Sequence, residues 1–240
     1  MFLTARWEDL VLLNYSCPPH VLDPLVPRGT VLDLWNGEAL VSVVGFLFRN
    51  TRVLGFRIPL HRTFEEVNLR FYVRRTMSSG EPRRAVVFVR ELVPRRAIAA
   101  VARWIYNEPY LAVPMAHQSS LTEADGGAVS YSWSHRQAHF RLSADVSGPA
   151  RPPATGSEAE FITEHYWGYT RQRNGDTLEY QVEHPAWRTW AAPAATLSGP
   201  VASLYGSAFG AALSNPPRSA FVACGSAVVV HHGIRLAPAG

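Results

Sequence analysis

Alternation of apolar and polar residues, the pattern of half-buried strands, recurs along most of this chain of 240 residues. It is clearest over residues 64–76, where apolar side chains fall between charged and amide ones: Phe64, Val67, Leu69, Phe71 and Val73. Further strands are expected at 1–16, 30–34, 39–49, 52–58, 84–92, 128–143, 161–171, 177–184, 219–229 and 233–237. Turn signals separate several of them, at Asn36-Gly37, near Asn50, at Ser78-Ser79-Gly80 and at Asn174-Gly175.

Helical spacing is confined to a few short segments. Pro94 opens the clearest one, at 94–106, whose apolar residues recur at helical intervals and which ends before Pro109. Shorter helices are expected at 18–27, between prolines, and at 201–213. We therefore expect an α+β protein, mostly β, with a few short helices in one domain over residues 1–240.

Composition narrows the class of protein. Hydrophobic residues make up 47% and charged residues 18% of the chain, which is typical of a globular protein. The net charge is only +4 and the arginine pairs are spread along the chain, so we expect no nucleic-acid partner. Two cysteines, Cys17 and Cys224, make neither a disulfide framework nor a zinc set.

No signal for export or membrane insertion is evident. Glu8 and Asp9 lie where a signal peptide has its apolar core, and the longest apolar stretch, 220–230, is too short to span a bilayer. We expect a soluble cytoplasmic protein with no membrane partner, and the sequence leaves a homo-oligomer open.

The chain contains no lysine, since all 23 of its Lys and Arg residues are arginines. A Schiff base on lysine and a phosphate-binding Walker lysine are therefore excluded. Arginine stays protonated in proteins and cannot replace lysine as an amine nucleophile. No nucleotide-binding glycine fingerprint is present either, so we expect no cofactor and no metal.

Several segments spread over nearly the whole chain resemble the YqjF-like family of uncharacterised bacterial proteins. They are residues 31–37, 64–70, 106–110, 163–169 and 182–185, the last reading Val-Glu-His-Pro. That family is similar in fold to acetoacetate decarboxylase, which implies a closed β-barrel or cone around a buried pocket.

The resemblance to the decarboxylase also implies a site. Glu66 takes the place of the pocket glutamate of that enzyme, and the segment Val89-Arg90-Glu91-Leu92 resembles its Gly-Arg-Glu-Leu stretch. The decarboxylase then has Pro-Lys-Lys, where this chain has Pro94-Arg95-Arg96. Decarboxylation through an imine is thus excluded. What remains is a carboxylate near arginines, which suits a carboxylate, keto or enol group.

Glu65 and Glu66 are neighbours in the expected strand, so their side chains point to opposite faces and one of them should face the interior. A buried carboxylate would have a raised pKa and could act as a general acid or base. The alternative is a structural partner for a core arginine such as Arg90 or Arg70. His61, just before this strand, is expected at the pocket mouth or in a capped turn.

Arg95 and Arg96 fall at the start of the expected helix 94–106, where a helix N-terminus favours anions. They could hold a ligand, or they could be ordinary surface arginines.

If Asn174-Gly175 forms a two-residue loop, His165 and His184 face each other across the hairpin, with Cβ atoms about 5 Å apart. Such a pair could act as acid and base, or bind a metal if His61 or His135 supplied a third ligand. The alternative is a structural or pocket-lining pair.

The leading hypothesis is an enzyme that acts on a small carbonyl or carboxylate substrate by acid/base chemistry. Glu66 would transfer the proton, and arginines would orient the anion. The expected binding residues are Arg90, Arg95, Arg96, Glu65, His61, His165 and His184. The competing hypothesis is a non-catalytic domain that binds or senses a small ligand, and a third is a protein that docks a partner through its arginine pairs.

Overall fold

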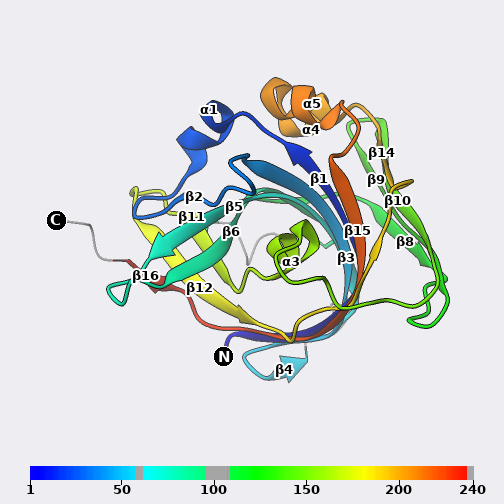
Figure 1. The fold of residues 1–240 in the computed structure, drawn as a ribbon, viewed down its shortest axis with the longest axis horizontal. Helices are drawn as coiled ribbons and strands as arrows, with labels where there is room; N and C mark the ends of the chain where they lie inside the picture. The colour runs from blue at the N-terminus through cyan, green and yellow to red at the C-terminus, as the bar shows by residue number, and fades with distance from the viewer. Residues whose placement is uncertain (58–61, 96–106, 108, 237–240) are drawn as a thin grey trace.

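The computed structural model describes residues 1–57, 62–95, 107 and 109–236. Its main sheet closes on itself into a ring (Figure 1). The hydrogen-bonded path runs through β15 (Ser219–Val230), β1 (Leu3–Ser16), β3 (Leu40–Val53), β5 (Phe64–Thr76), β6 (Pro82–Val93), β11 (Trp167–Arg171) and β12 (Thr177–Glu183), and β12 pairs again with β15. Neighbouring strands of the ring are antiparallel except β6 and β11, which are parallel.

Short strands extend the ring at its edges. They are β2 (Val31–Leu32), β4 (Phe56–Arg57), β7 (Tyr110–Ala112), β13 (Thr189–Ala191) and β16 (Ile234–Arg235). A second, separate sheet contains β8 (Met115–Ser119), β9 (Gly126–His135), β10 (Ala138–Ser147) and β14 (Thr196–Ser198). The expectation of a mostly β protein with few short helices is confirmed.

The helices among the described residues are short. They are α1 (Pro19–Leu22), the 3-10 turn η1 (Asp23–Leu25), α3 (Glu158–Thr163), α4 (Val201–Tyr205) and α5 (Ser207–Leu213). Gly206, with φ of 88°, divides the single helix expected at 201–213 into α4 and α5. The helix expected at 94–106 lies almost entirely outside the described residues. None of the helices in the described part of the chain is long and apolar enough to cross a membrane.

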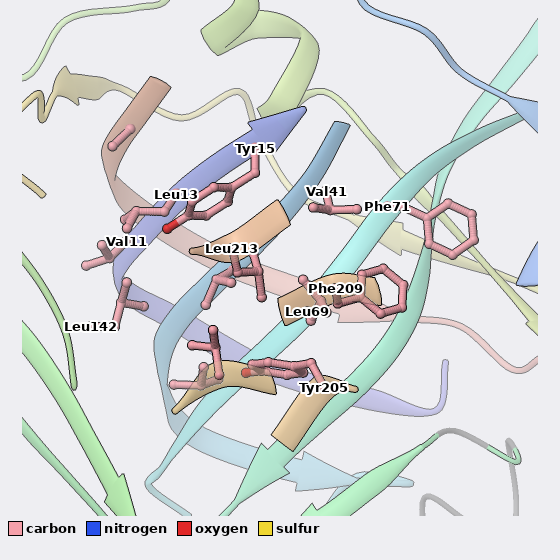
Figure 2. Packing of buried hydrophobic residues seen from close by; sticks show 14 of the residues in the cluster. Val11, Leu13, Tyr15, Val41, Leu69, Phe71, Leu142, Tyr205, Phe209 and Leu213 are labelled. Atoms are coloured by element: carbon pink, nitrogen blue, oxygen red, sulfur yellow. The ribbon is translucent and has the colours of Figure 1, made fainter. Parts of the chain in front are cut away.

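The larger core lies on the outer face of the ring. Apolar side chains of β1, β3 and β5 pack there against α4, α5 and the second sheet (Figure 2); those of the strands include Val11, Leu13, Val41, Leu69 and Phe71. The second sheet packs tightly against β3 at Gly45, where an added Cβ would lie 2.7 Å from the Tyr131 ring. A side chain larger than glycine at this position would push the two sheets apart.

The alternate residues of the same strands point into the ring. Leu10, Val44, Phe46 and Tyr72 belong to this inner cluster, together with Phe161 and Ile162 of α3. Figure 1 shows α3 drawn within the outline of the ring. The period of two along each strand therefore separates the residues of the outer core from the residues that face the interior.

Two local predictions were wrong. The chain does not turn near Asn50, because β3 continues to Val53 and turns at Leu54-Gly55. The strand expected from residue 161 begins only at Trp167, because α3 occupies the preceding segment. Ser157 caps that helix, as its Oγ accepts the Glu160 N–H at 3.2 Å.

The hairpin between β11 and β12 has a longer loop than expected. Arg171 pairs with Thr177, so Arg173, Asn174 and Gly175 lie between the bonded residues Gln172 and Asp176. The Asn174 side chain bonds Asp176, and Gly175 has φ of 89°, the left-handed conformation that three-residue hairpin loops require. The register is therefore shifted by one residue from that of a two-residue loop.

Candidate functional site

The inner face of the ring encloses a cavity of about 290 Å³. Most of its wall is apolar or aromatic, with Trp7, Leu10, Val44, Phe46, Phe48, Phe64, Val86, Phe88 and Trp187 among the lining residues. Ionisable and hydrogen-bonding side chains also line it: Glu66, Asn68, Arg70, Glu91, Tyr110, His165 and His184. A cavity with mainly apolar walls and a few polar groups is the usual form of a small-molecule site.

Glu66 is the buried carboxylate that alternation along β5 predicted, with 2% of the residue exposed. One carboxylate oxygen, Oε1, accepts a hydrogen bond from Asn68 Nδ2 at 3.0 Å, and the other, Oε2, accepts one from the Tyr110 hydroxyl at 3.1 Å. Burial raises the pKa of Glu66 to about 7, although both hydrogen bonds and the charge of Arg70 favour the ionised form. The carboxyl group can therefore both hold and release a proton near neutral pH.

Asn68 and Arg70 were missed as cavity residues by the sequence analysis, which considered Arg70 only as a structural partner. They follow Glu66 at intervals of two along β5, so the alternation that turns Glu66 inward does the same for them. Arg70 Nη2 donates to the Ile162 carbonyl at 3.4 Å, and its guanidinium lies 5.7 Å from the centre of the Tyr72 ring. Half-buried Arg70 is thus a fixed positive charge beside the cavity.

A bulge in β6 decides which charged residue of that strand faces the cavity. Leu69 pairs with Arg90 but Arg70 pairs with Phe88, so Val89 is the extra residue. Phe88 and Glu91 line the cavity, whereas Arg90 lies on the outer face, where its charge acts on Tyr205 of the outer core. The expectation that Arg90 binds substrate was therefore wrong, since the bulge reverses the inward and outward alternation after Phe88.

Four other expected residues are not shown at the site. Glu65 faces the second sheet, where burial, and after it the charges of Asp9 and Glu65, raise the pKa of Tyr131, so its expected role in binding was wrong. Arg95 is exposed and does not line the cavity. His61 and Arg96 lie outside the described residues, so their expected roles stay predictions.

His165 lies between α3 and β11 with 7% of the residue exposed, and it lines the cavity. Its Nε2 is 3.4 Å from Asp33 Oδ2, and its ring contacts Tyr72 and Phe161. Burial lowers the pKa of His165 to about 4, although Asp33 favours the protonated form. The imidazole is therefore neutral at pH 7 and can accept a hydrogen bond through one ring nitrogen.

Asp33 is itself buried and binds Arg84, whose Nε donates to Oδ2 at 2.7 Å. Burial would raise the pKa of Asp33, but hydrogen bonds from His165 and Arg84 hold it below its usual value. Asp33 is thus an ionised carboxylate that orients the His165 ring, a role that the sequence analysis missed.

His184 lines the same cavity but does not face His165 across the hairpin. β11 begins only at Trp167, which pairs with Gln181, so His165 lies before the paired residues, and His184 stacks on Trp187 with ring centres 4.1 Å apart. Burial lowers the pKa of His184 as well. Within the described residues, no group of three or more His, Cys, Asp and Glu side chains could hold a metal ion.

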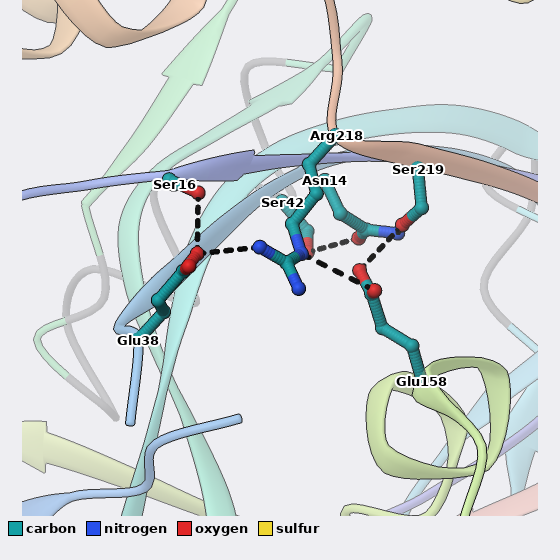
Figure 3. A network of polar contacts seen from close by, with 7 residues as sticks. All are labelled: Asn14, Ser16, Glu38, Ser42, Glu158, Arg218 and Ser219. Carbon is teal, nitrogen blue, oxygen red and sulfur yellow. Dashed lines mark hydrogen bonds and ion pairs between the residues drawn. The ribbon is translucent and has the colours of Figure 1, made fainter. Parts of the chain in front are cut away.

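A chain of hydrogen bonds anchors α3 to the ring (Figure 3). Glu158, the first residue of α3, accepts from Ser219 Oγ at 2.6 Å and from Arg218 Nε at 3.3 Å. Ser219 in turn accepts from Asn14 at 2.9 Å, and Asn14 accepts from Ser42 at 2.6 Å. These bonds fix the helix whose Ile162 and Thr163 line the cavity.

Comparisons with known proteins agree with this fold. The family model DUF2071, described as "Uncharacterized conserved protein", matches residues 4–227. The "Uncharacterized protein YqjF" of Bacillus subtilis (strain 168) is 27% identical over 190 residues, which are 77% of this chain and 74% of that protein. The expected resemblance to the YqjF-like family is confirmed.

Solved structures share the fold at low sequence identity. An acetoacetate decarboxylase-like enzyme from Sphingomonas wittichii RW1 is similar with a TM-score of 0.67 and 14% identity, over 98% of this chain and 92% of that one. The acetoacetate decarboxylase of Legionella pneumophila is similar with a TM-score of 0.65 and 14% identity, over 99% and 88%. The enduracididine biosynthesis enzyme MppR, complexed with pyruvate, has a TM-score of 0.70 and 13% identity, over 98% and 90%. At these identities the likeness shows the fold alone.

Proposed function

Because this chain belongs to the DUF2071 family of uncharacterised conserved proteins, we propose its function from the cavity itself: an enzyme that moves a proton on a small carbonyl or carboxylate compound. Glu66 is the proton-transfer group. The observation that carries the proposal is a carboxyl group buried in a ligand-sized cavity, with its pKa raised to about 7. A general acid or base works best when its pKa lies near the working pH.

The surrounding groups fit such a reaction. Removal of a proton from the carbon beside a carbonyl forms an enolate, whose negative charge needs donors or a nearby cation. Arg70 and the Tyr110 hydroxyl line the cavity with Glu66, and Asn68 bonds the carboxylate directly. Glu66 would take the proton from carbon and return it, so the carboxyl group ends the cycle in its starting state.

Neutral His165 adds a hydrogen-bonding group to the same cavity. Burial moves the pKa of Glu66 up and that of His165 down, and such a separation is typical of an acid and base that work together. Since MppR binds pyruvate in a related fold, a keto acid is a reasonable first substrate to test.

The alternative to this proposal is a domain that binds a ligand without catalysing a reaction. In that case the buried carboxylate should be held by arginine and should stay ionised at neutral pH. The partners of Glu66 are the uncharged Asn68 and Tyr110, and the raised pKa favours the protonated form, so the enzyme is the better supported of the two.

Proton exchange between a keto acid and heavy water tests the proposal. The protein would be incubated with pyruvate in deuterated buffer, and loss of the methyl proton signal would be followed by NMR. We expect exchange above the buffer rate for the wild type, and a drop of about 100-fold in Glu66→Gln, the usual size of a general-base contribution.

Glu65→Gln is the matched control, because the neighbouring side chain faces the second sheet and not the cavity. It should exchange pyruvate at the wild-type rate. Binding of pyruvate without any exchange would overturn the enzyme and favour the ligand-binding domain. Equal loss of exchange in both variants would mean that the substitutions disturb the folding of β5, and would not implicate the Glu66 carboxyl group.

A further inference from the structure

An aromatic wall lines the cavity immediately beside Glu66. We give this name to Trp7 of β1, Phe46 and Phe48 of β3, Phe64 of β5 and Trp187, all of which line the cavity. Phe46 is the cross-strand partner of Glu66, and Phe48 is the partner of Phe64. The carboxyl group and the aromatic wall are thus neighbours on one inner surface.

The rings of the wall contact one another. Phe48 and Phe64 stack with centres 4.5 Å apart and an angle of 15°, and Phe46 lies 5.1 Å from Phe48. Trp7 lies 4.9 Å from Phe46 and 6.1 Å from Trp187. These contacts hold the rings in place, so the wall is a preformed apolar surface.

An apolar surface of this kind is poorly suited to water. Apolar cavities tend to stay dry, and burial of an apolar group against them is favourable in proportion to the area removed from water. A small polar compound such as pyruvate would occupy the polar groups around Glu66 and leave the aromatic wall without a partner. A water molecule occupies about 30 Å³ in the liquid, so the cavity of about 290 Å³ has room for a ligand of at least roughly ten non-hydrogen atoms.

We propose that the cavity selects keto acids, or related carbonyl acids, whose carbon skeleton carries an apolar group the size of a phenyl ring or larger. The apolar group packs on the aromatic wall, and the keto acid head meets Glu66, Asn68 and Arg70. This inference rests on the proposed function, because it names the substrate class of the same site.

Calorimetric titration of the wild type with phenylpyruvate and with pyruvate tests the selection directly. The two compounds share the keto acid head and differ in the phenyl group. We expect phenylpyruvate to bind at least about tenfold more tightly, which is the gain expected from burial of one apolar ring. Equal affinities, or binding of neither compound, would overturn the inference.

Phe48→Ala removes one ring of the wall, and Phe56→Ala is its matched control, because Phe56 on β4 is 76% exposed and outside the cavity. We expect Phe48→Ala to weaken the binding of phenylpyruvate by about tenfold and that of pyruvate by less than about twofold. Phe56→Ala should change neither. If Phe48→Ala does not fold, Phe48→Leu is the second variant to test, because leucine keeps the position filled. It should weaken phenylpyruvate binding by a smaller factor. Equal weakening of both compounds by the Phe48 variants would count against the wall.

Glu66→Gln separates this inference from the proposed function. If the keto acid head binds away from Glu66, Glu66→Gln leaves the affinities for phenylpyruvate and pyruvate unchanged. The preference for phenylpyruvate, and its loss in Phe48→Ala, would then persist, and only the proposed function would fail. If Glu66→Gln alters the binding of both compounds but phenylpyruvate has no advantage, the substrate class fails and the proposed function stands.

Discussion

Asp33 Oδ2 lies 3.4 Å from His165 Nε2. Asp33 directly follows β2, and the buried imidazole of His165 lines the cavity. Asp33 also accepts a hydrogen bond from Arg84 at 2.7 Å. One carboxylate thus lies beside a cavity histidine and holds Arg84 of β6.

We predict that Asp33→Asn lowers the free energy of unfolding by about 1–3 kcal/mol, because it removes the charge that Arg84 and His165 share. Urea unfolding measures the change. Asp145→Asn is the control, since Asp145 is exposed on β10, and it should stay within about 0.5 kcal/mol of the wild type. Equal stability of the two variants would contradict a structural role for Asp33.

The pH dependence of stability should reveal two opposed groups. Burial raises the pKa of Glu66 from 4.5 to about 7 and lowers that of His165 from 6.5 to about 4. Between pH 4.5 and 6.5, the native state holds a proton on Glu66 that the unfolded chain has lost. In the same window it lacks a proton on His165 that the unfolded chain holds. As pH rises through this window, the Glu66 contribution to stability therefore falls and the His165 contribution rises.

Glu66→Gln removes the first contribution and leaves the second. We predict that the variant loses stability more steeply than the wild type as the pH is lowered from 6.5 to 4.5. At about pH 8 it should be more stable than the wild type by about 1–3 kcal/mol, because the wild type then ionises a buried carboxyl group. Urea titrations at several pH values measure both effects. Parallel curves for the two proteins would mean that the pKa of Glu66 is close to that of an exposed glutamate.

Ligand binding should distinguish the two charged neighbours in β6. We predict that Glu91→Gln changes the Kd of a keto acid by several-fold, because Glu91 lines the cavity. Arg90→Gln should change it by less than about twofold, because Arg90 lies on the outer face near Tyr205. Calorimetric titration of both variants measures the difference. The reverse ranking would place Arg90 in the cavity and contradict the bulge.

The anchoring of α3 should depend on Glu158. We predict that Glu158→Ala lowers stability by about 1–2 kcal/mol and speeds amide hydrogen exchange in residues 158–163, since it removes the bonds from Ser219 and Arg218. Glu123→Ala is the control, because Glu123 pairs with Arg188 at the exposed surface. Exchange that is unchanged in α3 would show that its apolar side alone holds the helix.

The long strands and the face that each residue occupies could be predicted from the sequence where alternation is unbroken. In β5 the period of two separates Val67 and Leu69, which belong to the outer core, from Glu66 and Asn68, which face the cavity. That pattern predicted that one of Glu65 and Glu66 faces the interior, and the resemblance to acetoacetate decarboxylase indicated Glu66. The resemblance to acetoacetate decarboxylase added the closed architecture, which no local pattern specifies.

The remaining parts of the site depend on single-residue shifts that leave little trace in the sequence. The loop at Arg173-Asn174-Gly175 is one residue longer than an Asn-Gly pair suggests, and β11 begins only at Trp167, so the expected pairing of His165 with His184 is not part of the hairpin. The bulge at Val89 likewise exchanged Arg90 for Glu91. In both cases the hydrophobic pattern is compatible with either register, because hydrogen bonds of the folded sheet decide between them.

One overlooked signal was present in the sequence. Ser157 and Glu160 have the spacing of a helix capping box, and the Glu160 side chain accepts the Gly156 N–H at 2.7 Å. This pattern would have placed a helix start at Ser157 and moved the start of the strand expected at 161–171 beyond that helix. The helix carries Ile162 and Thr163 into the cavity, so the signal bears on the site as well as on the fold.

The bulge in β6 also decides which charge faces the cavity, because one extra residue changes which of two neighbouring side chains points inward. Arg90 and Glu91 are adjacent, carry opposite charges and occupy opposite faces of one strand. If β6 paired without the bulge, with Val89 opposite Leu69, Arg90 would point into the cavity and Glu91 away from it, without a change in either side chain. A relative whose β6 lacks the bulge would present a guanidinium to its ligand where this protein presents a carboxylate, so the position of one bulge can change the charge of the cavity while the amino acids stay the same.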